Sequence, residues 1–182
     1  MRRQIEKLCY VLLTISGLFS VPAMACVEMV ACIEGVDGES VIKGYDKCID
    51  INGWSWGVDQ PANQYVAGGG TRERPNFVEF SFTKYADTSS PVLMKRSVEG
   101  THIQEAKIHI NRCTESKISL YEFIFNQVLV SSIDMGGFSV DDRPTEVITL
   151  NFAKFQFSYT PQNADGSAGA PVEFFWDVKL DQ

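Results

Sequence analysis

The chain has 182 residues, of which 23 are acidic and 16 are basic, so its formal net charge is −7 at pH 7. An acidic surface repels phosphate backbones, and no cluster of Lys and Arg offsets it, so the composition disfavours a nucleic-acid-binding protein. The sequence also lacks the basic amphipathic helix that would favour binding to a membrane surface.

The first 25 residues have the pattern of a secretory signal peptide. Three basic residues in the first seven positions precede a mostly apolar run over 8–19, and Ala23 and Ala25 are the small residues that a signal peptidase accepts at −3 and −1. The apolar run is shorter than the ~20 residues of a comfortable membrane span. We expect cleavage after Ala25 and a secreted or periplasmic bacterial protein, with a retained anchor helix as the less favoured alternative.

Cleavage at this position would remove three basic residues and one acidic residue, which makes the formal charge of the mature chain about −9. The 157 residues that remain are enough for one domain with a single substantial core. They are too few for such a domain together with a separate catalytic domain. We therefore expect a signal peptide over 1–25 and one domain over 26–182.

The mature chain keeps four cysteines, namely Cys26, Cys32, Cys48 and Cys113. An even number suits an oxidising compartment, and four cysteines allow three complete disulfide pairings. The pair Cys32 and Cys48 is the first to consider, because the predicted strands place these residues on the two arms of one hairpin. Zinc is disfavoured because the chain has no CxxC motif and no histidine at zinc-finger spacing.

Cys26 would be the first residue after cleavage and could carry a lipid. For the cleaved chain, a lipid at Cys26 is the one membrane attachment that we consider. A lipoprotein cleavage site usually has Leu at −3, whereas this chain has Ala23 there. Ordinary cleavage is therefore the favoured expectation, and lipidation of Cys26 is the alternative.

Short strands dominate the mature chain, and no long run of period 3.6 competes with them. Alternation around Val78, Phe80 and Phe82 predicts that these three side chains form a buried face. Breaks in the alternation at Gly53 and at 126–127 predict β-bulges, which let a strand bend around a barrel corner. The predicted strands cover 27–34, 48–58, 76–86, 102–113, 118–133, 145–160 and 172–180.

One short helix follows the third strand. Ser90 is expected as its N-cap, Pro91 as its first helical residue, Val92–Val98 as its body, and Gly100 as the residue just past its end. The helix is expected to be structural. Surface loops are expected at 60–75 and 134–144.

The motif G-x-S-x-G occurs at 53–57 and would make Ser55 a nucleophile in an α/β-hydrolase. The context argues against this role, because no helix follows the motif and the chain lacks alternating βα units. Two tryptophans flank Ser55, and such bulky side chains suit barrel packing better than a nucleophile elbow. We do not expect Ser55 to be catalytic.

Other residues of catalytic type are equally poorly placed. His102 and His109 fall at opposite parities of one strand, so they would face opposite sides and could not easily share a metal. The carboxylates of Asp141 and Asp142 lie in a turn, where solvated side chains are far commoner than a glycosidase pair. We therefore expect no active site, no metal and no cofactor.

The C-terminal segment 150–179 is the most informative part of the chain. Phe155, Phe157 and Tyr159 alternate with polar residues, and a loop rich in Gly, Asp and Pro leads to a second aromatic strand, which predicts a β-hairpin. Its amino-acid sequence, YTPQ followed by ADGSAGAP and WDVK, resembles the C-terminal hairpin of the Hcp family, the tube proteins of bacterial type VI secretion systems. Upstream segments resemble the same family in order and spacing: EGVDGES at 34–40, SWGVDQP at 55–61, FSFTKYADTSSPVLMK at 80–95, GTHIQEA at 100–106 and VLVSSI at 128–133.

The resemblance implies an all-β fold, a compact barrel of antiparallel strands with one short flanking α-helix. It further implies hexameric rings of identical subunits that stack into a hollow tube, secreted effector proteins carried in the lumen, and tip or sheath components of the secretion machine as partners. In these terms the loop with Gly68, Gly69, Gly70, Arg72 and Arg74 resembles the long loop that reaches a neighbouring subunit or ring. Here the usual Gly-rich continuation is replaced by TRERP at 71–75, a departure from the family that counts against the stacking of rings.

Two alternatives to a tube subunit remain open. The first is an exported single-domain binding or surface protein on the same barrel that does not stack, which the signal peptide and the four mature cysteines favour. The second is an enzyme effector on this scaffold, which we disfavour because toxin-bearing relatives usually need an added domain.

Overall fold

The computed structural model describes residues 26–61, 74–113 and 118–181. The predicted signal peptide lies outside the described residues, so its cleavage stays a prediction. Ten strands and one helix, α2 (Ser89–Glu99), are described. The strands are β1 (Val27–Ile33), β2 (Ile49–Ser55), β3 (Val58–Asp59), β4 (Asn76–Phe77), β5 (Phe80–Tyr85), β6 (Ile103–Arg112), β7 (Ser119–Gly136), β8 (Thr145–Asn151), β9 (Lys154–Tyr159) and β10 (Val172–Asp177).

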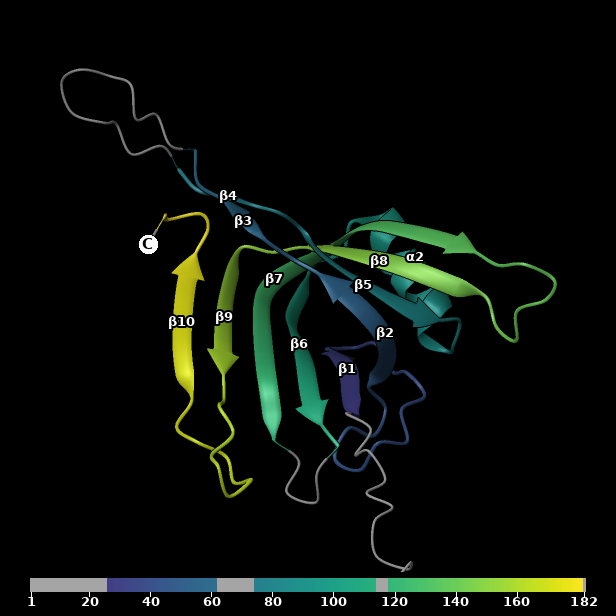
Figure 1. Cartoon of the computed structure of the whole chain (residues 1–182). Helices are drawn as coiled ribbons and strands as arrows, with labels where there is room; N and C mark the ends of the chain where they lie inside the picture. Colours follow the sequence, from purple (N-terminus) through teal and green to yellow (C-terminus); the bar gives the residue numbers. More distant parts are fainter. Residues whose placement is uncertain (1–25, 62–73, 114–117, 182) are drawn as a thin grey trace, which may run out of the picture.

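Six antiparallel strands close into a barrel, in the order β7, β6, β1, β2, β5, β8 and back to β7. Strands β9 and β10 extend the sheet outward from β7 and stay outside the closed ring of strands (Figure 1). A barrel removes most free sheet edges by pairing each strand on both sides. The all-β barrel with one short helix that the sequence predicted is therefore confirmed.

Strand β7 belongs to both parts of the sheet. Its first half pairs with β9 over Tyr121–Asn126, and its second half pairs with β8 from Leu129 onward. Between the two halves, Gln127 has a φ of 53°, a left-handed backbone that few non-glycine residues adopt. The predicted break at 126–127 is thus the point where the strand turns from one partner to the other.

Three predicted strands are interrupted in the structure. The segment 48–58 divides into β2 and β3, and its register shifts between Ile51 and Gly53, as the predicted bulge required. The segment 145–160 divides at 152–153, where the chain turns from β8 to β9. The segment 76–86 divides at Val78, which is 46% exposed, so its place in the predicted buried face was wrong.

Aromatic side chains from the barrel strands and from β9 pack together in the core. Trp56 packs against Phe155 with 4.8 Å between ring centroids, and Trp54 stacks on Phe80 at 5.9 Å. Phe80 and Phe125 are fully buried. Burying one such side chain stabilises the fold by ~1.5–3 kcal/mol, so this aromatic group is a major part of the core.

Helix α2 starts one residue before its predicted N-cap. Thr88 occupies the N-cap position, and the amide of Ser89 donates to Oδ1 of Asp87 at 2.9 Å. The predicted cap, Ser90, is instead a buried residue of the first turn. Gly100 ends the helix in the left-handed conformation with φ 60°, as the sequence indicated. No helix in the part of the chain that the structure describes is long and apolar enough to cross a membrane.

Candidate assembly surface

Strand β10 forms an open edge of the sheet. It pairs with β9 along its whole length, from Val172 opposite Tyr159 to Asp177 opposite Lys154. No other strand of the described residues lies against its outer side. Phe175 is 55% exposed and Val172 is 69% exposed. A six-residue edge strand that exposes apolar side chains is a surface on which another chain can pair.

The inner face of β10 continues an aromatic surface that begins in the core. Phe174 lies 5.8 Å from Phe155 and 5.9 Å from Trp176, measured between ring centroids. Tyr121 lies 5.5 Å from Tyr159 on the neighbouring strands. Phe174 is 49% exposed, so this aromatic surface reaches solvent at the sheet edge.

The WDVK motif, residues 176–179, anchors β10 to β9 and to the point where β7 changes its pairing partner. Asp177 accepts a 2.9 Å hydrogen bond from Lys154 Nζ and bonds from the backbone amides of Lys179 and Leu180 at 3.0 Å. The hydrogen bond from Lys154 is the main reason that the pKa of Asp177 lies below its usual value, although burial opposes it. Lys179 Nζ donates to Oε1 of Gln127 at 3.0 Å, which ties the motif to the turn of β7.

The base of the predicted inter-subunit loop lies beside the WDVK motif. Strands β3 and β4 form a two-stranded ribbon that leads away from the barrel, and Phe77 packs 5.2 Å from Phe155 and 6.3 Å from Trp176 (Figure 1). Arg74 is exposed, and its Nε lies 3.8 Å from the Asp181 carboxylate. Residues Gly68, Gly69, Gly70 and Arg72 lie outside the described residues, so their part in assembly stays a prediction.

A buried ionic cluster fixes helix α2 to the barrel. Lys84 Nζ lies 2.8 Å from both the Glu146 and Asp87 carboxylates and donates to Ser90 Oγ at 2.9 Å. Burial alone would raise the pKa of Asp87, but the hydrogen bonds and charge of Lys84, with the bonds from Ser89, outweigh it and lower that pKa. Polar networks of this kind hold two elements in a single arrangement.

Sequence reasoning missed this cluster, although the strand period contained a signal. Lys84 follows Phe80 and Phe82 at a spacing of two, and Glu146 precedes Ile148 and Leu150 at the same spacing. Side chains at that spacing share one face of a strand, here the buried face. A charged residue of each sign at the end of two inward patterns indicates a buried pair.

The four cysteines among the described residues form two disulfides. Cys32 is joined to Cys48 with 4.5 Å between their Cα atoms, and Cys26 is joined to Cys113 with 5.2 Å. The first bond has the pairing considered from the sequence. The second bond uses the sulfur that a lipid would need, so the alternative of a lipid anchor at Cys26 is incompatible with this structure.

The side chains of catalytic type are dispersed. Ser55 is exposed at the end of β2, and His102 is exposed before β6. His109 lies half-buried on the outer face of β6, 3.2 Å from Glu122 and 4.9 Å from the Tyr45 ring. Within residues 26–61, 74–113 and 118–181, no group of three or more His, Cys, Asp or Glu side chains is placed to hold a metal ion.

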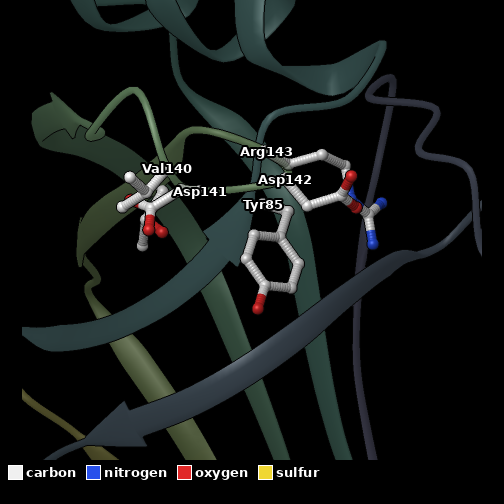
Figure 2. A pocket seen from close by; sticks show the side chains of 6 residues that line it. Tyr85, Val140, Asp141, Asp142 and Arg143 are labelled. Carbon is white, nitrogen blue, oxygen red and sulfur yellow. The ribbon is translucent and has the colours of Figure 1, made fainter.

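A cavity of about 370 Å³ lies where the β7–β8 loop meets the end of β5, and it contains the predicted turn carboxylates (Figure 2). The guanidinium of Arg143 lies 4.6 Å from the centre of the Tyr85 ring. Asp141 accepts a 3.0 Å hydrogen bond from the Phe138 amide, which closes its own turn. The Asp142 side chain is fully exposed. These contacts close the turn of the β7–β8 loop and tie the loop to β5.

These features describe a closed β-barrel protein whose edge strand exposes apolar side chains, a surface on which another chain can pair. Comparison with known proteins gives the family. The model of the type VI secretion system effector Hcp matches residues 31–159. The protein hcp1 of Pseudomonas aeruginosa strain PAO1 is 40% identical over 155 residues, which cover 84% of this chain and 96% of that protein. The chain therefore belongs to the Hcp family, as its motifs indicated.

Solved structures share the fold. The structure of a type six secretion system protein superposes with a TM-score of 0.81 at 24% identity and covers 86% of this chain and 99% of its own. Hcp1 from Salmonella typhimurium has a TM-score of 0.69 at 22% identity, with 86% of this chain and 97% of that one covered. At these identities the likeness shows that this chain has the same fold as these proteins.

Proposed function

We propose that this protein is an exported subunit that closes into homo-hexameric rings, and that these rings stack and carry or shield effector proteins in their lumen. The observation that carries the ring is the open edge of β10 with its exposed Phe175. In a cyclic ring each subunit uses two different surfaces, so an edge on one side must meet another surface of the next copy. The role is structural and involves no catalysis.

Ring formation is tested by the mass of the mature chain. Light scattering of residues 26–182 over a range of concentrations should give six subunits per particle, and negative-stain images should show rings. Only monomer at every concentration would overturn the proposal.

A variant of the edge strand sharpens this test. Phe175→Lys places a charge on the open edge, and we expect it to shift the particles to monomers because burying an unpaired charge is costly. Val98→Lys is the matched control, since Val98 is 80% exposed and belongs to α2, a helix that Figure 1 shows well away from β10. Equal loss of rings in both variants would contradict a specific role for β10.

A second candidate function is an exported binding or surface protein on this barrel that does not stack. The two disulfides and the TRERP sequence in the predicted inter-subunit loop favour it. Images that show single rings or monomers with intact disulfides, and no tubes at high concentration, would support this candidate. Tubes under the same conditions would contradict it.

A further inference from the structure

The junction between β1 and β2 is the shortest junction of the barrel. Only Val30 with Asp50 and Ala31 with Ile49 are paired across it. By contrast, β1 and β6 pair continuously from Val27 opposite Arg112 to Ile33 opposite Ala106. We call the β1–β2 junction the seam. A short ladder has few hydrogen bonds and few side-chain pairs to resist opening.

The disulfide between Cys32 and Cys48 extends this short ladder by one position. Because the strands are antiparallel, the pair that follows Ala31 and Ile49 is Cys32 opposite Cys48, and their Cα atoms are 4.5 Å apart. The covalent bond therefore lies at the place where hydrogen-bonded pairing ends.

Core residues lie directly behind the seam. Val30, Ala31 and Ile49 are fully buried, and Ile51 is 4% exposed. If β1 and β2 separated, these side chains would meet water, although the other junctions of the barrel could stay paired.

The same disulfide also holds the loop 34–47 against the barrel. The amide of Gly38 donates to the Lys47 carbonyl at 2.7 Å, which brings the loop back along the chain just before Cys48. Within this loop, the Tyr45 ring lies over His109, and its hydroxyl donates to Oδ1 of Asn111 at 3.4 Å. The loop thus covers part of the outer face of β6.

The other disulfide lies at a junction that needs no such support. Cys26 and Cys113 extend the long β1–β6 ladder beyond Val27 and Arg112, and the Cys113 amide also donates to the Cys26 carbonyl at 3.1 Å. Both bonds are cystines within one chain, but only one of them joins strands that are otherwise weakly paired. The second disulfide is a matched control for the first.

We propose that oxidation of Cys32 and Cys48 is the step that closes the barrel at the seam, and that the reduced chain opens there locally. Each thiol loses its proton, two electrons pass to an oxidant with a disulfide bond, such as oxidised glutathione, and that oxidant leaves as two thiols. Resting on the proposed ring function, the inference extends to assembly: the oxidised chain forms rings, and the chain with an open seam does not, because β1 and β2 no longer hold a single shape.

Hydrogen exchange measured by mass spectrometry tests the closure directly. In Cys32→Ala/Cys48→Ala, peptides that cover β1 and β2 should exchange at least ~10-fold faster than in the unaltered chain, whereas peptides from β5 and β8 should change by less than ~2-fold. In Cys26→Ala/Cys113→Ala, the β1 and β2 peptides should stay within ~2-fold of the unaltered chain. Equal effects of the two variants, or no effect at the seam, would overturn the proposal.

A second measurement keeps the test valid if the seam variant does not fold. The variant Cys26→Ala/Cys113→Ala retains only the seam disulfide, so the same chain can be compared before and after reduction with dithiothreitol and after reoxidation with oxidised glutathione. Faster exchange confined to β1 and β2 on reduction, reversed on reoxidation, supports closure by the disulfide. An unchanged exchange pattern, or uniformly faster exchange of all strands, overturns it.

Light scattering on the same samples separates the two proposals. Rings in the oxidised state and monomers in the reduced state support both. Monomers in both states, with seam-selective exchange, contradict the ring and leave closure of the seam standing. Rings in both states with unchanged exchange overturn the seam proposal alone.

Discussion

Lys84 and Glu146 form an ion pair in which both side chains are completely buried, with 2.8 Å between Nζ and Oε2. The pair joins β5 to β8, and Ser90 Oγ, which donates to the same Glu146 oxygen at 2.8 Å, adds helix α2 to the network. Removing one partner of a buried pair leaves an uncompensated charge, which is much costlier than removing both.

We predict that Lys84→Met lowers the free energy of unfolding by ~3–5 kcal/mol, because Glu146 then stays buried without its cation. The double variant Lys84→Met/Glu146→Leu should lose less than the single variant. Urea unfolding followed by tryptophan fluorescence measures both variants and the single variant Glu146→Leu. A double variant whose loss equals the sum of the two single losses would show that the two charges are not coupled.

His109 should make the stability depend on pH. Burial lowers the pKa of His109 from 6.5, the Glu122 carboxylate opposes this effect, and Lys107 adds to it. The unfolded chain then binds a proton at a higher pH than the folded chain, so stability is full above pH ~6.5 and falls as the pH drops through the lower, folded pKa. His109→Gln should flatten the plot of Tm against pH in this range.

The control for this prediction is His102→Gln, which removes an exposed imidazole one residue before the same strand. We expect its Tm to follow that of the unaltered chain from pH 7.5 down to pH ~5. If both variants flatten the plot equally, the buried position of His109 is not the cause.

Asp177 should control the order of the assembly edge. Asp177→Asn weakens the contact with Lys154, so amides of β10 should exchange ~10-fold faster, and rings should be lost at concentrations where the unaltered chain forms them. Glu173→Gln, an exposed change on the same strand, is the matched control for exchange, and its β10 amides should exchange as in the unaltered chain. Slow exchange of β10 in Asp177→Asn would show that the WDVK contacts do not anchor the strand.

Gly38 should not tolerate a larger residue. A Cβ atom at Gly38 would lie 2.5 Å from the Cys48 carbonyl oxygen and 2.8 Å from Cγ1 of Ile49, so the backbone of the loop or of β2 would have to shift. Gly38→Ala should lower the free energy of unfolding by ~1–3 kcal/mol, measured by urea unfolding. Gly57→Ala, where a Cβ meets nothing within 4 Å, should stay close to the unaltered chain.

The helix and its neighbours illustrate how far local sequence reaches. Gly100 ended the helix where the sequence placed it, because a left-handed residue is a local requirement of the chain. The N-terminal end was misplaced, because Ser90 has the side chain of a cap but is drawn into the network of Lys84 and Glu146. Those partners lie six and 56 residues away, beyond any local rule.

The strands also combine features that the local sequence predicted with features that it did not. The break at 126–127 and the bulge at Gly53 were readable, since a change of phase in a period-two pattern is visible along the chain. The exposure of Val78 could not be predicted in this way. That residue lies between β4 and β5, and its burial depends on which other segments pack against it. The edge position of β10 likewise depends on the order of all the strands in the sheet.

The sequence by itself determined the class of fold, the approximate extents of most strands, the short helix and the family. It could do so because alternation, turn residues and sequence motifs are properties of neighbouring residues. Only the tertiary structure decided that β10 lies at the edge of the described sheet, that Lys84 meets Glu146, and that the seam is the shortest junction of the barrel. These features depend on contacts between distant segments, whose register is set when the whole barrel closes.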